Sequence, residues 1–169
     1  MSVPLLAITA APLDAGPLVA ALLARQAGQA AATDGASTGA VATFLGLVRD
    51  RNQGRRVRYL EYEAYQPLAV RAFERIAAEA AEEWPSALLA IHHRVGTLQI
   101  GEASIVIAAA SPHRGDAFAV CRYAIERVKQ IAPIWKREHF EGGDTWIEGA
   151  VADPDDEEAR QSARRIACV

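Results

Sequence analysis

Hydrophobic residues either alternate with polar ones or recur every three to four positions along most of the 169-residue chain. The first pattern predicts strands and the second predicts helices. Strands are predicted at 5–8, 40–48, 57–65, 88–95, 103–110, 134–140 and 145–148. Helices are predicted at 17–28, 67–84 and 112–131. Alternating strands and helices, with at least one hairpin, favour an α+β fold with a mixed sheet over a purely parallel one.

The segments between and after these elements lead to three further predictions. The polar, turn-rich segment 49–56 predicts a hairpin of strands 40–48 and 57–65 with a mobile, arginine-rich tip. Small and polar residues at 28–39 predict a loop. The acidic stretch that begins at Asp153 predicts a solvated tail, so that 1–150 is one domain and 151–169 is a C-terminal tail that need not be ordered.

Composition excludes several broad classes of protein. The chain is 51% hydrophobic and 23% charged, with a net charge of −3, which is typical of a soluble globular domain and argues against a general nucleic-acid or membrane-surface binder. No uncharged apolar run reaches the roughly 18 residues of a membrane span, and the N-terminal segment lacks the basic start of a signal peptide. Two cysteines are too few for a disulfide framework, so we expect a cytoplasmic protein.

Lysine is rare in this chain. Of the 18 basic residues, only Lys129 and Lys136 are lysines, and the other sixteen are arginines. Arginine stays protonated and offers no nucleophilic amine. The scarcity of lysine therefore raises the question of what arginine could not do at these two positions.

Helical geometry places Lys129 at the border between the core and the solvent. At about 100° per residue, the core stripe of helix 112–131 holds residues 117, 120, 121, 124, 125, 128 and 131. A lysine beside this stripe can pack its stem and place its amine in a cleft, where it can act as a base or nucleophile. The alternative is a solvated lysine that caps the last carbonyls of the helix.

Lys136 follows the Pro133 helix stop, in an extended segment where Ile134, Lys136 and Glu138 share one face. The two lysines flank one turn, so a shared pocket is geometrically plausible. The alternative for Lys136 is an exposed charge on an edge strand.

A second candidate site lies where a buried strand meets a helix, at residues 111–115. Ser111 is a candidate N-cap, and free N–H groups beside His113 and Arg114 predict an anion site suited to the phosphate of a small molecule. The alternative is a capped helix with two solvated cations. Glycine-rich dinucleotide and P-loop motifs are absent from the sequence.

Other polar residues carry weaker signals. Arginines 49, 51, 55, 56 and 58 form either a solvated loop or a surface for an anionic ligand or acidic partner, with single-stranded RNA as a weaker option. His92 and His93 point to opposite faces of one strand, so no metal site is expected, and no cofactor is expected either. Cys121 is expected in the core and Cys168 in the tail, rather than as sulfur carriers.

Five stretches together resemble the large, catalytic subunit of molybdopterin synthase: residues 39–50, 60–65, 93–96, 111–114 and 129–138. The resemblance implies an α/β-hammerhead fold with a largely antiparallel sheet and flanking helices. It also implies a homodimer with a small ubiquitin-like sulfur carrier at each end, hence a heterotetramer. The carrier's C-terminal Gly-Gly thiocarboxylate would enter the active site.

The implied activity is a sulfurtransferase of molybdenum cofactor biosynthesis. It would convert cyclic pyranopterin monophosphate to molybdopterin by two sulfur transfers. The resemblance makes Lys129 and Lys136 catalytic, and Arg49, His113 and Arg114 substrate-binding; which lysine is acid, base or nucleophile stays open. The alternative function is a non-catalytic dimeric module that binds a phosphorylated metabolite and a protein partner.

Overall fold

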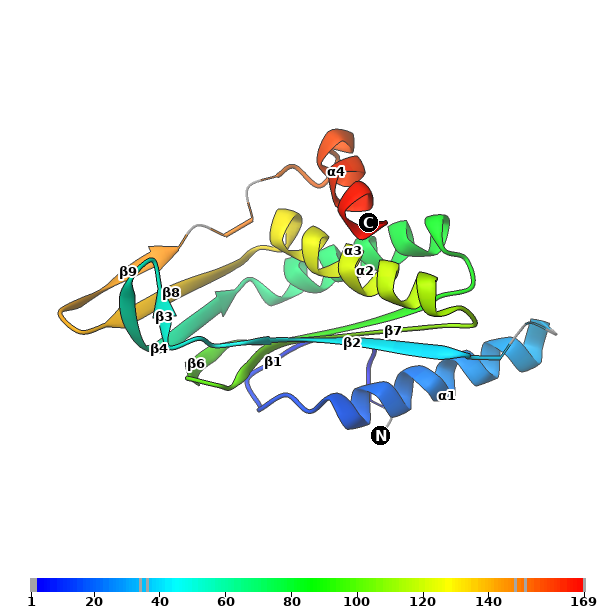
Figure 1. Cartoon of the computed structure of the whole chain (residues 1–169), viewed down its shortest axis with the longest axis horizontal. Coiled ribbons are helices and arrows are strands. Elements are labelled where there is room, and N and C mark those ends of the chain that lie inside the picture. Colours follow the sequence, from blue (N-terminus) through cyan, green and yellow to red (C-terminus); the bar gives the residue numbers. More distant parts are fainter. Residues whose placement is uncertain (1–2, 34, 36, 148, 151, 169) are drawn as a thin grey trace.

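The computed structural model describes residues 3–33, 35, 37–147, 149–150 and 152–168. Two sheets follow one another along the long axis of the molecule, and helices cover both faces of one of them (Figure 1). In chain order the elements are β1 (Leu6–Thr9), α1 (Ala15–Thr33), β2 (Ala40–Leu47), β3 (Arg51–Asn52), β4 (Arg55–Ala64), α2 (Gln66–Glu83), β5 (Leu88–Arg94), β6 (Gly96–Gln99), β7 (Ala103–Ser111), α3 (Arg114–Ile131), β8 (Ile134–Phe140), β9 (Gly143–Ile147) and α4 (Glu157–Ala167). The α+β fold class is as predicted.

The first sheet has the strand order β1-β5-β7-β2, with β1 parallel to β5 and the other pairs antiparallel. Strand β7 is buried on both faces, which explains its uninterrupted apolar sequence. Ile105, Ile107 and Ala109 pack toward α2 and α3, whereas Val106 and Ala108 pack toward α1. The core therefore forms two layers, one on each side of this sheet.

The second sheet has the order β3-β4-β8-β9, and β6 also pairs with β4. The predicted hairpin of 40–48 with 57–65 is wrong, because β2 pairs with β7 and β4 pairs with β8. Only the short β3 forms a hairpin with β4, around Gln53 and Gly54 at φ 48° and 79°. Alternation of apolar and polar residues shows which side chains share a face, but it does not determine which strand is the partner. In this fold the apolar β7 is the partner of β2.

Helix boundaries differ from the predictions by two or more residues at three ends, one of which is the start of α1 at Ala15. Helix α1 continues to Thr33, through the alanines at 30–32 that the predicted loop 28–39 included, because alanine is the strongest helix former. Residues 34 and 36 of that loop lie outside the described part of the chain. Helix α3 begins at Arg114, two residues later than predicted. The last strand ends at Ile147, and Glu148 of the predicted strand is outside the described residues.

The expectation of a solvated tail is wrong for residues 157–167, which form α4. The Asp156 side chain caps this helix by accepting from the N–H groups of Glu158 and Ala159. Ala163 and Ala167 are buried against the core that contains α3, and Figure 1 shows α4 lying over that helix. Val151 and Val169 of the predicted tail lie outside the described residues.

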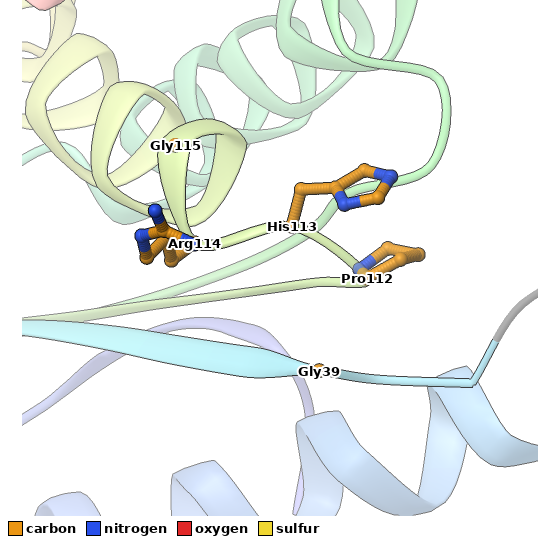
Figure 2. Close-up of a pocket in the computed structure, with 5 residues that line it drawn as sticks. All are labelled: Gly39, Pro112, His113, Arg114 and Gly115. Atoms are coloured by element: carbon orange, nitrogen blue, oxygen red, sulfur yellow. The ribbon is translucent and has the colours of Figure 1, made fainter.

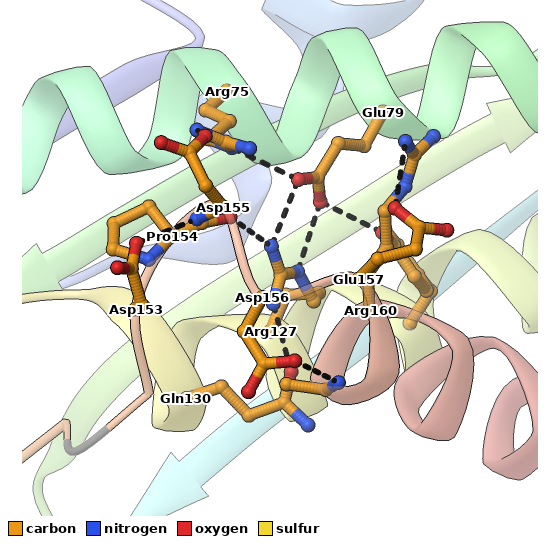
Figure 3. Close-up of polar contacts among 12 residues, drawn as sticks. Arg75, Glu79, Arg127, Gln130, Asp153, Pro154, Asp155, Asp156, Glu157 and Arg160 are labelled. Carbon is orange, nitrogen blue, oxygen red and sulfur yellow. Dashed lines mark hydrogen bonds and ion pairs between the residues drawn. The ribbon is translucent and has the colours of Figure 1, made fainter.

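A buried ion pair between Glu79 of α2 and Arg127 of α3 lies beside this C-terminal segment (Figure 3). Arg127 is fully buried, and its Nε and Nη2 donate to the two carboxylate oxygens of Glu79 at 2.9 and 2.8 Å. Tyr123 donates to the same carboxylate at 2.7 Å, and Arg127 also donates to the Pro154 carbonyl. Burial raises the pKa of Glu79, but hydrogen bonds led by Arg127 outweigh it and hold that pKa below its usual range.

Three ion pairs join the segment to α2: Arg75 with Asp155 at 2.7 Å, Arg160 with Glu82 at 2.6 Å, and Arg164 with Glu83. In the described part of the chain, no helix is long and apolar enough to cross a membrane.

Candidate active site

Lys129 lines a groove between the free edge of the first sheet and α3. The groove has a volume of about 430 Å³, and its walls come from β2, α3 and the last residue of α4. It is lined by Ala42, Thr43, Phe44, Phe118, Cys121, Arg122, Ile125, Glu126, Lys129 and Ala167. Lys129 itself is exposed. Lys129 thus lies at the border between core and solvent, as the helical wheel predicts, in a groove that apolar and charged side chains line together.

Lys136 lies on β8, beyond the turn that ends α3. Its Nζ is 3.5 Å from Oε1 of Glu138, and its side chain is 31% exposed. Glu138 is buried, and both of its carboxylate oxygens accept from Nδ2 of Asn52 at 2.9 Å. Lys136 does not contribute to the groove that Lys129 lines. The two lysines therefore occupy neighbouring elements, each with its own surroundings.

Arg49 follows the end of β2 and is exposed. The end of β2 pairs with the start of β7, since Leu47 lies opposite Ala103. Helix α3 starts after the far end of β7 and runs back along the sheet, so its C-terminal end returns toward Arg49 (Figure 1). Arg49 and Lys129 are thus at the same end of the first sheet.

His113 and Arg114 lie at the other end, at the start of α3. They line a cavity of about 330 Å³ together with Gly39, Pro112 and Gly115. Figure 2 shows their side chains pointing away from one another. A Cβ at Gly39 would lie 2.2 Å from the Pro112 carbonyl oxygen, so only glycine allows this close approach of the two backbones.

The predicted N-cap at Ser111 is wrong. His113 occupies the cap position without a side-chain cap bond, and the Ser111 hydroxyl instead accepts from the His113 N–H at 3.2 Å. The first turn of α3 therefore has no side-chain cap, which keeps N–H groups available for an anion.

The predicted site residues form two groups in one chain. Arg114 and Lys129 are fifteen residues apart on one helix, which corresponds to about 22 Å along the axis. The side chains of Arg114 and Lys129 are too short to span this distance. The two residues of one chain therefore cannot touch the same reacting atom. Each copy of the chain thus carries an end with His113 and Arg114, which is the predicted anion-binding end, and a lysine-bearing end.

Comparisons with known proteins decide the family. The family model described as "MoaE protein" matches residues 8–131, which includes Lys129, His113 and Arg114 but ends before Lys136. The chain belongs to the MoaE family. A molybdopterin synthase catalytic subunit of Bacillus subtilis (strain 168) is 54% identical over 109 residues, covering 64% of this chain and 69% of the relative. One of Nostoc sp. (strain PCC 7120) is 47% identical over 119 residues, covering 69% and 72%.

Solved structures agree with this assignment. Molybdopterin synthase from Staphylococcus aureus has a TM-score of 0.77 at 37% identity, covering 86% of this chain and 98% of that one. The MoaE protein from Burkholderia ambifaria MC40-6 has a TM-score of 0.70 at 37% identity, covering 92% and 95%. The resemblance to molybdopterin synthase is confirmed: the chain is of the catalytic-subunit type, a sulfurtransferase of molybdenum cofactor biosynthesis.

The remaining candidate residues are placed as follows in this MoaE protein. All five arginines of 49–58 are exposed, and Arg55 lies 4.8 Å above the ring of Phe140. His92 and His93 contact the backbone carbonyls of Pro4 and Arg94, and no group of metal-binding side chains occurs in the described residues.

The two cysteines differ in their surroundings. Cys121 is buried, and burial raises the pKa of its thiol to about 11, whereas Cys168 is exposed at the end of α4. A thiol with such a raised pKa is almost wholly protonated at neutral pH and is a poor sulfur nucleophile.

Sequence reasoning missed Asn52 and the role of Glu138. The signal for Glu138 is in the sequence, because it stands two residues from Lys136 on the same face of a strand. The sequence holds no such signal for Asn52, because its contact with Glu138 joins residues that are 86 positions apart and depends on the strand order of the second sheet.

Proposed function

We propose that two copies of this chain together form each active site, and that this site converts cyclic pyranopterin monophosphate to molybdopterin. His113 and Arg114 of one copy meet Lys129, Lys136 and Arg49 of the other. The observation that carries the proposal is the distance of about 22 Å between Arg114 and Lys129 along α3. A second copy related by a twofold axis supplies the missing half to each site.

The anion-binding end suits the phosphate of the substrate. Uncapped N–H groups at the start of α3 and the Arg114 guanidinium are donors to phosphate oxygens, and His113 adds a group that can carry a proton. Arg49 is exposed at the lysine-bearing end of the other copy, where it adds a further cation. A general acid is needed there when the cyclic phosphate opens.

The groove at Lys129 suits the extended tail of a sulfur-carrier protein. Phe44 and Phe118 both line the groove, and a Gly-Gly tail has no side chains to clash with them. The relatives carry the name of a catalytic subunit, which fits a small carrier as the second kind of subunit.

The sulfur transfer balances without a redox partner. A bond forms between the carrier's sulfur and a substrate carbon as a carbon–oxygen bond of that carbon breaks, and the oxygen leaves as water or stays on the opened phosphate. Water then cleaves the acyl carbon–sulfur bond and supplies the oxygen with which the carrier leaves as a carboxylate. Two such exchanges complete the dithiolene. Lys129 supplies an amine beside the thiocarboxylate, as acid, base or transient nucleophile, and Lys136 holds the terminal anion of the carrier.

The experiment combines the purified chain, thiocarboxylated carrier and cyclic pyranopterin monophosphate, and measures molybdopterin formed. Lys129→Ala is expected to abolish turnover while carrier binding persists, and Lys129→Arg is expected not to restore it, because a guanidinium does not give up its proton. Arg165→Ala, which removes an exposed charge on α4, is the control and keeps the wild-type rate. A normal rate for Lys129→Ala would show that this residue is not catalytic.

A further inference from the structure

Glu138 is a carboxylate inside the second sheet with two specific partners. It is 5% exposed on β8, between β4 and β9. Nδ2 of Asn52 donates to both of its oxygens at 2.9 Å, and Nζ of Lys136 is 3.5 Å from Oε1. A buried charge is tolerated only when it is paired and hydrogen-bonded, so both partners matter to this carboxylate.

The sheet order explains how these three residues meet. Lys136 and Glu138 are two positions apart on β8 and share a face. Asn52 belongs to β3, which is separated from β8 by β4. Its side chain therefore reaches past one strand and connects the arginine-bearing hairpin, residues 49–58, to the strand that carries Lys136.

We infer that Asn52 is a positioning residue for Lys136 and acts through Glu138. This inference rests on the proposed function, in which Lys136 is a residue of the active site. Asn52 fixes the orientation of the Glu138 carboxylate, and that carboxylate presents one defined oxygen to the Lys136 ammonium. The separation of 3.5 Å is long for an ion pair, so the ammonium keeps donors free for the anion at the end of the carrier tail.

The same contact couples the hairpin to the lysine. Arg49, Arg51 and Arg55 are exposed on the hairpin, and the Asn52 side chain between them points inward to Glu138. A ligand that orders the hairpin through its arginines also fixes Asn52 and, through Glu138, the position of Lys136.

The test separates a positioning role from a structural one by exchanging the two partners of the hydrogen bond. Asn52→Asp places two carboxylates against each other, and Glu138→Gln removes the charge beside Lys136. Combined, the two substitutions restore an amide–carboxylate hydrogen bond with donor and acceptor reversed, but the carboxylate now belongs to β3. Folding is followed by urea unfolding, and kcat and KM for the thiocarboxylated carrier are measured for each variant.

The positioning role predicts that Asn52→Asp lowers both stability and kcat, the latter by about ten- to a hundredfold. The double variant then regains stability but not kcat. A kcat that returns together with stability would overturn the inference, because a structural role requires only the hydrogen bond.

Asp144→Asn is the matched control. It removes the partner of Arg137 between β8 and β9 of the same sheet, where both side chains are 37% exposed, and it is expected to leave kcat unchanged. Wild-type chain that forms no molybdopterin in this assay would instead disprove the proposed function, so the two failures are distinguishable.

Discussion

Arg114 and Lys129 lie at opposite ends of helix α3, with about 22 Å of helix axis between them. The resemblance to molybdopterin synthase assigns both residues to one active site. A single copy of the chain does not satisfy that assignment, because α3 is a continuous helix and does not bring its ends together. The distance supports the proposed site shared by two copies, and it gives the family assignment a geometric consequence.

The buried pair of Glu79 and Arg127 is expected to dominate the stability of the helical layer. Glu79→Gln leaves the fully buried guanidinium without its counter-charge and is expected to lower the free energy of unfolding by about 3–5 kcal/mol. Urea unfolding measures the loss.

Glu82→Gln is the control for this pair. It breaks the ion pair with Arg160, in which the Glu82 side chain is 68% exposed, and should cost about 0–1 kcal/mol. Equal losses for the two variants would show that burial does not set the strength of the Glu79 contact.

His93 makes the stability depend on pH. Burial lowers the pKa of His93 from 6.5 to about 4 in the folded chain. Its folded pKa is below its unfolded pKa, so the unfolded state binds more protons between these values, and stability is lost as the pH falls from 6.5 toward about 4. The loss is about 3 kcal/mol at the acid end of this window.

Urea unfolding at several pH values checks this expectation. His93→Asn removes the titrating ring, and its free energy of unfolding should change much less than that of the wild type between pH 6.5 and 4. If the free energy of unfolding of this variant depends on pH as steeply as that of the wild type, groups other than His93 cause the effect.

The cysteines are expected to be dispensable for sulfur transfer. Cys121 lines the Lys129 groove, but burial raises the pKa of its thiol to about 11. A thiol reagent at neutral pH should therefore label Cys168 quickly and Cys121 slowly in the folded chain. Molybdopterin formation by Cys121→Ala should match the wild type. Loss of turnover in this variant, with normal stability, would point to a sulfur carrier on α3.

Local patterns predicted most of the elements because the residues within them are self-consistent. The apolar run of β7 and the core stripe of α3 are examples, and every residue of that stripe is buried in the structure. The surroundings of Lys129 followed from the same helical periodicity. Lysine scarcity alone singles out Lys129 and Lys136 in the sequence.

Features that depend on long-range pairing were not predictable in this way. Strand β2 pairs with β7, which comes about sixty residues later, and not with the nearby β4. Helix α4 has an acidic first turn and a basic last turn, as a capped helix should. Its acidic start predicts a solvated segment. Arg75 and Arg127, which bind the residues just before this helix, lie far away in the sequence, so the local pattern does not reveal them.

The shared active site is tested most directly by complementation between inactive subunits. Lys129→Ala and Arg114→Ala chains are each expected to form little molybdopterin alone. When the two are co-expressed and purified together, half of the twofold dimers are mixed and each carries one intact site of two, so about a quarter of the wild-type activity should return. A mixture as inactive as its parents, with mixed dimers present, would show that Lys129 and Arg114 of different copies do not share a site.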